Sequence, residues 1–294
     1  MDQMTSAHPE TVARITPVKP NSVKMRSIPT KLGRLAIYDT GIPSRMHASS
    51  QVLVLWPSVL ADHRIYAAQV AALRERHRLI LIDGPGHGAS GASPGRFSMA
   101  QCADAVVEGL DALEIVQPVV CIGTSWGGLV AGEFALGHPD RARAVVMLNA
   151  PVFKSSARWR DGFVSWGARW LKRTNVYADG VAESYFMPET RKRETAFMDE
   201  FRDHIRRAHG AAMARAVRSV LLERDDLASR LKGIAAPTLF VAGTHDPMCP
   251  IDDLRRAAAQ LPHGRFVELP TAHLSVVDAP AETTRAIAAF LDDL

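Results

Sequence analysis

Short apolar runs and amphipathic stretches alternate along most of the chain. The apolar runs are continuous rather than interrupted by polar residues, as in strands that are buried on both faces of a parallel sheet. The predicted strands are 23–28 and 35–39, which form an opening hairpin, then 52–56, 79–83, 119–123, 144–149, 238–243 and 265–269; the predicted helices are 65–76, 98–113, 251–260 and 281–291. This order predicts an α/β fold in which a mostly parallel central sheet is flanked by helices.

Residues 152–234 break this alternation. They contain no strand-like run but at least three helical stretches, near 162–173, 191–209 and 211–223. They also hold three of the five tryptophans, and we expect most of the aromatic side chains here to form the segment's own core. The pattern predicts a flexible tail at 1–22, an α/β core made of 23–151 and 235–294, and a helical insertion at 152–234 after the sixth strand.

The composition is that of a soluble globular protein. Of the 294 residues, 47% are hydrophobic and 22% are charged, and no apolar run is long enough to span a bilayer. The N-terminal residues lack the apolar centre of a signal peptide. Cys102, Cys121 and Cys249 are an odd number without a Cys-x-x-Cys pair, so we expect neither a disulfide framework nor a zinc site. These features predict a cytoplasmic protein with no membrane span.

The net charge of +4 originates in the insertion. Between Val152 and Gly233 there are 17 Lys or Arg residues and 11 Asp or Glu residues, so the rest of the chain is slightly acidic. The basic cluster 191–193 has acidic neighbours, Glu189 and Glu194, which is typical of a solvated helix face. No zinc finger, RNA-binding aromatic motif or Walker-type loop accompanies the charge, so no nucleic-acid partner is expected.

A glycine-flanked serine directly follows the predicted strand 119–123. The sequence reads Gly123-Thr124-Ser125-Trp126-Gly127-Gly128, and a helix-like run begins at Leu129. A turn this tight between a strand and a helix admits only small residues two positions from the serine, and it pushes the serine hydroxyl out above the sheet. Serine is a weak nucleophile, so the chemistry also needs a histidine as base and a third group that orients the histidine.

The strand, serine turn and helix resemble the nucleophile elbow of the α/β-hydrolase family, and the resemblance extends from about residue 23 to residue 294. In that family an acid and then a histidine follow the serine, each on a loop after a strand. The loop 244–247 (Thr-His-Asp-Pro) resembles the acid loop, and 270–274 (Pro-Thr-Ala-His-Leu) resembles the histidine loop. The resemblance implies a catalytic triad of Ser125, Asp246 and His273, and it implies that the insertion is a helical cap over the active site.

Two other histidines and one alternative position for the acid must be weighed against this triad. His245 is adjacent to Asp246 but precedes it, which the strand order disfavours. His87 lies in a glycine-rich loop that is similar to a structural loop of the family, so we expect its side chain to be packed or exposed. Some relatives carry the acid after the sixth strand, where this chain has Asn149; an amide cannot replace the carboxylate, which favours Asp246.

Acyl transfer also needs two backbone N–H donors for the oxyanion. The resemblance implies Trp126 as one donor and a residue after strand 52–56 as the other. Where the family usually has His-Gly, this chain has Trp56-Pro57-Ser58, so the expected donor is Ser58, with Val59 as the next candidate. We also expect Trp56 and Trp126 to bind substrate. Enol-lactonases that act on 3-oxoadipate lactones likewise lack the His-Gly pair, and residues 56–91 look most like those enzymes and related esterases and perhydrolases.

The resemblance therefore implies a serine hydrolase that cleaves a small-molecule carboxylic ester or lactone through an acyl-enzyme on Ser125. No cofactor or metal is expected, and a homodimer is a candidate assembly. Two alternatives stay open: other chemistry on the same triad, namely carbon–carbon bond hydrolysis, perhydrolysis or acyl transfer, and a non-catalytic ligand-binding receptor of the same fold. Haloalkane dehalogenases and epoxide hydrolases are disfavoured because they use aspartate at the elbow. The acyl group is not determined, because fold and triad fix the chemistry and not the substrate.

Overall fold

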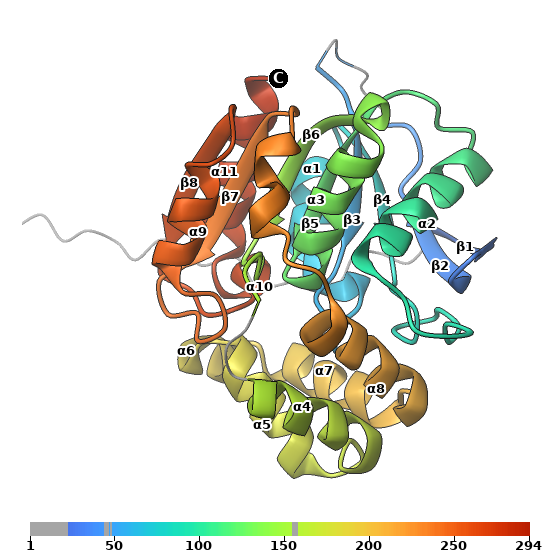
Figure 1. Ribbon diagram of the computed structural model, residues 1–294, viewed down its shortest axis with the longest axis vertical. Coiled ribbons are helices and arrows are strands. Elements are labelled where there is room, and N and C mark those ends of the chain that lie inside the picture. The colour runs from blue at the N-terminus through green and yellow to red at the C-terminus, as the bar shows by residue number, and fades with distance from the viewer. Residues whose placement is uncertain (1–22, 44–46, 48, 155–157) are drawn as a thin grey trace, which may run out of the picture.

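An eight-stranded sheet organises the part of the chain that the structure describes, which is residues 23–43, 47, 49–154 and 158–294 of this computed structural model (Figure 1). The strands are β1 (Lys24–Thr30), β2 (Gly33–Asp39), β3 (Val52–Trp56), β4 (Arg78–Ile82), β5 (Val119–Thr124), β6 (Ala142–Leu148), β7 (Thr238–Gly243) and β8 (Gly264–Leu269). Their order across the sheet is β1-β2-β4-β3-β5-β6-β7-β8. β2 is antiparallel to β1 and β4, and the other neighbouring pairs are parallel. The predicted fold class, a mostly parallel sheet flanked by helices, is confirmed.

The central strands are apolar along their whole length. Every residue of β3, β5 and β7 is buried, because helices cover both faces of the sheet (Figure 1). These helices are α1 (Ala67–Leu73), α2 (Met99–Ala112), α3 (Trp126–Gly137), α9 (Ile251–Ala258), α10 (Ser275–Asp278) and α11 (Pro280–Asp292). α1 packs beside α11, and α2 packs beside α3. Burial from both sides explains why the strands are continuous apolar runs in the sequence.

The strands and helices predicted for the core all occur, with ends that shift by up to three residues. The predicted start of α2 is right: the Ser98 side chain accepts from the Gln101 N–H, and the Gln101 side chain accepts from the Ser98 N–H, which makes a capping box. The helix predicted at 65–76 begins instead with a 3₁₀ turn, His63–Tyr66, because Asp62 caps the chain there by accepting from the Arg64 N–H.

The chain leaves the sheet after β6 and returns to it at β7, and the helices between these strands lie together beyond one end of the sheet (bottom of Figure 1). They are α4 (Arg158–Trp170), α5 (Asn175–Tyr185), α6 (Pro188–Arg193), α7 (Thr195–Arg207) and α8 (Gly210–Arg218), followed by helical turns at Ser219–Glu223 and Ala228–Gly233. The helices predicted near 162–173, 191–209 and 211–223 correspond to α4, α7 and α8. The predicted stretch 191–209 also includes the second half of α6, whereas the sequence pattern does not predict α5. The predicted tail, residues 1–22, lies outside the described residues.

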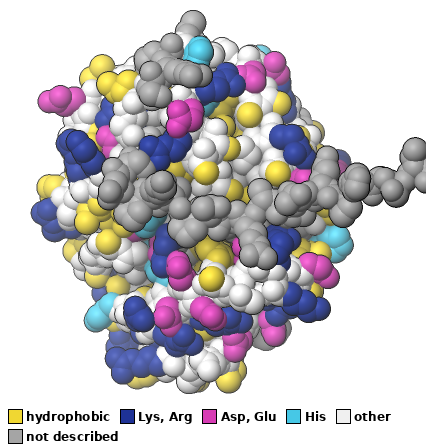
Figure 2. Space-filling model, turned by 180° about the vertical axis from the view of Figure 1, so that it is seen from behind, with side chains coloured by type: hydrophobic (Ala, Val, Ile, Leu, Met, Phe, Trp, Pro, Cys, Tyr) yellow, Lys and Arg dark blue, Asp and Glu magenta, His cyan; other side chains and the backbone are white. Residues whose placement is uncertain are grey.

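The surface of the insertion is mixed in character. On the face seen in Figure 2, basic and acidic side chains are interspersed over the helices at the bottom, as expected for a solvated surface. Arg202 pairs with Asp179 on α5, and Arg207 pairs with Asp203 one turn away. Phe163, Trp166 and Trp170 of α4 are 50–66% exposed, so the expectation of a shared aromatic core does not hold for this helix. None of the described helices is both long and apolar enough to cross a membrane.

Candidate active site

Ser125 occupies a tight turn between β5 and α3. Its φ of 55° lies in the left-handed region that non-glycine residues rarely adopt, and its N–H is fixed by the carbonyl of Leu148 at 2.8 Å. Glycine is required on both sides of the serine. A Cβ at Gly123 would lie 1.9 Å from the backbone of Gly127, and a Cβ at Gly127 would lie 1.8 Å from the carbonyl oxygen of Trp56. The structure therefore has the strand-turn-helix geometry expected from the sequence, with Ser125 facing a cavity.

His273 and Asp246 come together from two neighbouring loops. Asp246 follows β7 and His273 follows β8, so both lie at the carboxyl ends of parallel strands. Nδ1 of His273 lies 2.9 Å and 3.1 Å from the two carboxylate oxygens of Asp246. This leaves Nε2 for the cavity, which is lined by both His273 and Ser125. Among the described residues no hydrogen bond joins the Ser125 hydroxyl to His273; such bonds often tighten only when substrate binds.

The surroundings of Asp246 keep its carboxylate charged. Burial alone would raise the pKa of Asp246, but the charge and hydrogen bond of His273 outweigh it, with the Met248 N–H and the Asn149 amide adding to the effect. The net result is a pKa below the ordinary aspartate value. Nδ2 of Asn149 donates to Asp246 at 3.0 Å and to the carbonyl of Ala272 at 3.2 Å. Asn149 is not a carboxylate, but its amide bonds both Asp246 and the loop that carries His273, and so it links these two parts of the site.

Cys249 lies beside this pair and lines the cavity. Its Sγ donates to the carbonyl of Asn149 at 3.1 Å and lies 4.0 Å from Nδ1 of His273. Burial and the nearby charge of Asp246 hold the pKa of the thiol well above its ordinary value. Ligand atoms of Asp246, Cys249 and His273 lie within 4.8 Å of one another. Since a metal binds the thiolate and not the thiol, this environment favours an acid–base pair over a metal site.

The loop that follows β3, residues 57–61, borders the cavity through Val59 and Leu60. Ser58, the expected oxyanion donor, is fully buried and is not among the residues that line the cavity. The Leu60 N–H is bonded to Nε2 of His87 at 2.9 Å, and the Ala61 N–H is bonded to the carbonyl of Ser58 at 3.2 Å. The cavity position therefore favours the next candidate, Val59.

The side chains of Trp56 and Trp126 do not lie where the sequence analysis expected them. Both are fully buried, and they pack edge to face with ring centroids 5.3 Å apart. Trp126 also packs on Phe97 and His87, and neither tryptophan lines the cavity. The expectation that these side chains bind substrate is therefore corrected. They point into the core because all of β3 and residues 126–135 of α3 are buried, and Trp126 can contribute only its backbone N–H.

The cavity has a volume of about 570 Å³ and lies between the sheet and the insertion. The core contributes Ser125, His273 and Val59, and the insertion contributes apolar side chains that include Val181 and Leu221. Charged residues also reach the lining, namely Lys154, Arg224 and Asp253. A mostly apolar lining with a few polar groups is typical of a small-molecule site.

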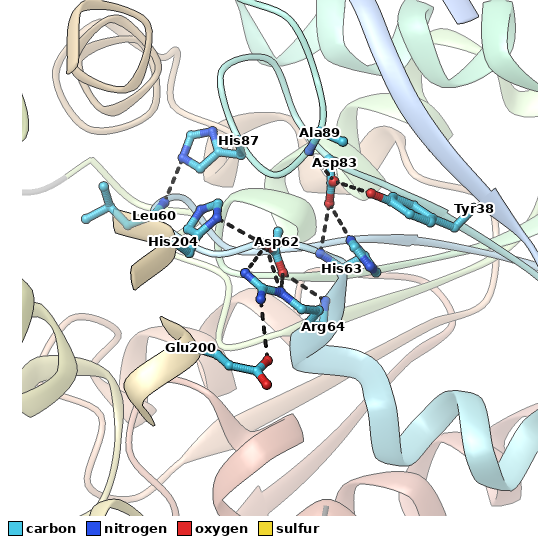
Figure 3. Close-up of polar contacts among 10 residues, drawn as sticks. All are labelled: Tyr38, Leu60, Asp62, His63, Arg64, Asp83, His87, Ala89, Glu200 and His204. Atoms are coloured by element: carbon cyan, nitrogen blue, oxygen red, sulfur yellow. Dashed lines mark hydrogen bonds and ion pairs between the residues drawn. The ribbon is translucent and has the colours of Figure 1, made fainter. Parts of the chain in front are cut away.

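Two buried carboxylates hold the loops behind this site (Figure 3). Asp83 accepts from the hydroxyl of Tyr38 at 3.1 Å, from the N–H and Nδ1 of His63 at 2.9 Å, and from the N–H of Ala89 at 3.0 Å. It thereby anchors the glycine-rich loop 84–88. His87 in this loop is 1% exposed, so its side chain is packed, one of the two placements expected.

Asp62, the second carboxylate, joins the core to the insertion (Figure 3). It accepts from Arg64 at 2.7 Å and from Nδ1 of His204, on α7, at 3.1 Å. Burial would raise the pKa of Asp62, but the hydrogen bonds and charges of His204 and Arg64 hold it well below the ordinary value. Asp62, His63 and Asp83 also have ligand atoms within 4.8 Å of one another, yet Asp62 is already paired with Arg64, and Asp83 already accepts from Tyr38 and Ala89.

Comparison with known proteins agrees with this architecture. Residues 51–280 match a family model described as alpha/beta hydrolase fold. The chain is 26% identical over 248 residues to 3-oxoadipate enol-lactonase 2 of Acinetobacter baylyi, covering 83% of this chain and 90% of that protein. It is 30% identical over 218 residues to the pimeloyl-[acyl-carrier protein] methyl ester esterase of Xanthomonas campestris, covering 70% and 80%.

A solved structure has the same fold. The enol-lactonase from Burkholderia xenovorans superposes with a TM-score of 0.79 at 27% identity, covering 88% of this chain and 96% of that one. The family model spans more than half of this chain and includes the β3, elbow and acid loops together with His273. The chain belongs to the alpha/beta hydrolase fold family.

Proposed function

We propose that this protein is a serine hydrolase that cleaves a carboxylic ester or lactone through an acyl-enzyme on Ser125. The observation that carries the proposal is the convergence on one cavity of Ser125, on its strained turn, and His273, held by Asp246 at 2.9 Å. The relatives support the substrate class, since they include an enol-lactonase and a methyl ester esterase.

In the proposed reaction neutral His273 accepts the proton of Ser125 at Nε2 while Oγ attacks the carbonyl carbon. The backbone N–H groups of Trp126 and Val59 stabilise the oxyanion. His273 then gives its proton to the leaving alcohol or enol, and a water molecule activated by His273 hydrolyses the acyl-enzyme. Asp246 fixes the tautomer of His273 and stabilises its charged form.

The cavity suggests which esters fit. Its mostly apolar lining favours an apolar acyl group. The positive charges of Lys154 and Arg224 in the lining are compatible with a substrate that also carries a carboxylate. Perhydrolysis or acyl transfer would begin with the same acyl-enzyme and would differ only in the molecule that accepts the acyl group. Hydrolysis of p-nitrophenyl acetate and butyrate therefore tests the shared first step and distinguishes an enzyme from a binding protein of the same fold.

The residue roles are tested with Ser125→Ala, Asp246→Asn and His273→Ala. Loss of the nucleophile is expected to lower kcat by about 10⁶-fold and loss of the acid by about 10⁴-fold, with little further loss when two changes are combined, because the residues act as one unit. A serine-directed phosphonate is expected to label the wild-type protein once, at Ser125, by mass spectrometry. Thermal melts check that each variant is folded, and a folded Ser125→Ala protein with wild-type turnover contradicts the assignment.

A further inference from the structure

Tyr185, the last residue of α5, contacts two loops of the candidate site: the 57–61 loop, which carries the oxyanion donor candidates, and the loop that carries His273. Its hydroxyl donates to the carbonyl oxygen of Val59 at 2.8 Å and accepts from the hydroxyl of Ser58 at 3.5 Å. Its backbone carbonyl accepts from the N–H of Leu274, the residue after His273, at 3.0 Å. One residue of the insertion is thus bonded both to the 57–61 loop and to the loop of the proposed base.

The position of Tyr185 is itself well defined. The side chain is 4% exposed, and its ring centroid lies 5.2 Å from that of His273. Phe186 and Phe201 pack against it from within the insertion, at 6.3 Å and 6.0 Å. Burial raises the pKa of Tyr185, so the phenol keeps its proton and acts as a donor to Val59. The tyrosine is therefore a fixed support and not a mobile contact.

From the core side, His87 supports the same loop (Figure 3). Leu60 has a φ of 64°, which a leucine rarely adopts, and its N–H donates to Nε2 of His87 at 2.9 Å. Nδ1 of His87 faces the carbonyl of Pro85 at 3.1 Å, which assigns the proton to Nδ1 and the acceptor to Nε2. Burial lowers the pKa of His87 to about 4, so Nε2 stays an acceptor at neutral pH. The Val59 carbonyl and the Leu60 N–H belong to one trans peptide group, so Tyr185 and His87 bind this group from opposite sides.

We propose that Tyr185 is a positioning residue: its hydroxyl, acting against the anchor at His87, sets the 57–61 loop so that the oxyanion donor points at the reacting carbonyl. The inference rests on the proposed hydrolase function. It has a consequence for the fold, because Tyr185 belongs to the insertion. The oxyanion hole and the histidine loop are complete only when α5 is packed on the core, so the insertion is part of the catalytic machinery as well as a cover.

The principal test is Tyr185→Phe, which removes only the hydroxyl. We expect kcat for p-nitrophenyl butyrate to fall about 10- to 100-fold, less than the roughly 10²- to 10³-fold loss on deleting a donor outright, with KM unchanged. Affinity for a trifluoromethyl ketone, which forms an oxyanion adduct with the serine, is expected to fall by the same factor, because the charge exists only in the adduct and the transition state. A residue that only stabilised the fold would not produce this parallel loss.

Tyr38→Phe is the matched control. It removes a phenol hydroxyl that is bonded to Asp83 at 3.1 Å, away from the cavity, and it leaves in place the bonds of Asp83 to His63 and Ala89 that hold the 84–88 loop. We expect it to lower the melting temperature and to leave kcat and ketone affinity unchanged. If Tyr185→Phe also lowers only the melting temperature and leaves kcat and ketone affinity unchanged, the proposal is overturned. A rise in KM at constant kcat also overturns it, because that result would mean that Tyr185 binds substrate.

Variants of His87 test the same loop from the core and stay informative if Tyr185→Phe folds poorly. His87→Leu removes the acceptor of the Leu60 N–H, whereas His87→Gln keeps an oxygen acceptor at similar reach. We expect His87→Leu to lose kcat and ketone affinity together and His87→Gln to regain most of both. Equal activity of the two variants overturns the proposal that the loop must be held.

The two proposals fail in distinguishable ways. If the wild-type protein has Ser125-dependent esterase activity but Tyr185→Phe matches it in kcat and ketone affinity, the proposed function stands and the role of Tyr185 is refuted. If wild-type hydrolysis is absent, or persists in Ser125→Ala, the proposed function is refuted and the role of Tyr185 falls with it.

Discussion

At the scale of single residues, the oxyanion donors depend on which peptide groups of the 57–61 loop are already engaged. The N–H groups of Leu60 and Ala61 are bonded within the protein, and Val59 borders the cavity whereas Ser58 is buried away from it. Ser58 donates its hydroxyl to Tyr185 instead, which gives it a supporting position. These contacts favour Val59 as the partner of Trp126 in the oxyanion hole.

Proline substitution tests this choice because proline has no N–H. We expect Val59→Pro to lower kcat by about 10²- to 10³-fold with little change in KM, and the adjacent Ser58→Pro to have a much smaller effect on kcat. Steady-state kinetics with p-nitrophenyl esters measures both, and thermal melts check that the variants are folded. A larger loss of kcat in Ser58→Pro than in Val59→Pro would mean that Ser58 supplies the oxyanion donor.

The sequence predicts the site residues that belong to local motifs, but it does not predict those that act through distant contacts. Ser125, Asp246 and His273 each follow a strand and belong to a local motif, and the structure places Ser125 and His273 on one cavity with Asp246 behind the histidine. Asn149 and Tyr185 act through contacts with residues far away in the sequence, which no local pattern records. Trp56 and Trp126 adjoin the motif residues in the sequence, but the pleat of β3 and the start of α3 direct their side chains into the core and away from the cavity.

At the scale of secondary-structure elements, the elbow is the most constrained junction. Helix α3 starts immediately after Ser125 and passes so close to β3 that a Cβ on Gly127 would lie 1.8 Å from the carbonyl oxygen of Trp56. We expect Gly127→Ala to destabilise the protein by about 3 kcal/mol, the upper part of the usual range for overpacking, and to abolish esterase activity by displacing Ser125. Thermal or urea unfolding and p-nitrophenyl ester assays measure the two effects.

Gly137→Ala, in the last turn of the same helix, is the control. Nothing lies within 4 Å of a Cβ at this position, and alanine favours helix over glycine by about 0.5–1 kcal/mol. We expect this variant to have unchanged activity and equal or slightly higher stability. If the two alanine variants behaved alike, the close approach of α3 to β3 would not be the reason for glycine at 127.

The sequence does not predict α5 in the insertion, nor the single turn α10 in the core. Helix α5 does carry a signal, because Tyr177, Val181 and Tyr185 repeat at a spacing of four and are buried, and the side chain of Thr174 caps the helix by accepting from the Tyr177 N–H. The signal is weak because small alanines and a glycine separate the large residues. The long core helices are easier to predict, since each follows a strand of the α/β alternation.

At the scale of the whole molecule, the insertion and the core are joined by polar contacts as well as by packing. Asp62 of the core accepts from His204 of α7, and Arg64 bridges Asp62 and Glu200, also on α7, at 2.7 Å and 3.4 Å (Figure 3). Tyr185 makes a second connection at the site itself. The sequence predicts an insertion at 152–234 but not how it is fastened, because each connection joins segments more than 100 residues apart.

The connection through Asp62 predicts how stability depends on pH. The pKa of Asp62 is held well below its ordinary value, so the folded state binds the proton less readily than the unfolded chain. Such a carboxylate stabilises the fold at every pH above its unfolded pKa, near 3.9, and loses this contribution progressively as the pH falls below that value. Asp62→Asn keeps the shape and the helix cap but removes the charge that His204 and Arg64 require. We expect this variant to be less stable than the wild type by about 3 kcal/mol at pH 7, as for a buried pair that loses one partner.

The difference should shrink as the pH falls below about 4, because the unfolded wild-type chain takes up a proton there that the folded carboxylate does not. Urea unfolding of both proteins across this range measures it, with Asp140→Asn, at an exposed position, as the control that is expected to match the wild type throughout. A stability difference that persisted unchanged to pH 3 would mean that Asp62 acts by shape and not by charge. Equal stability at pH 7 would mean that the charge of Asp62 does not help to hold the insertion on the core.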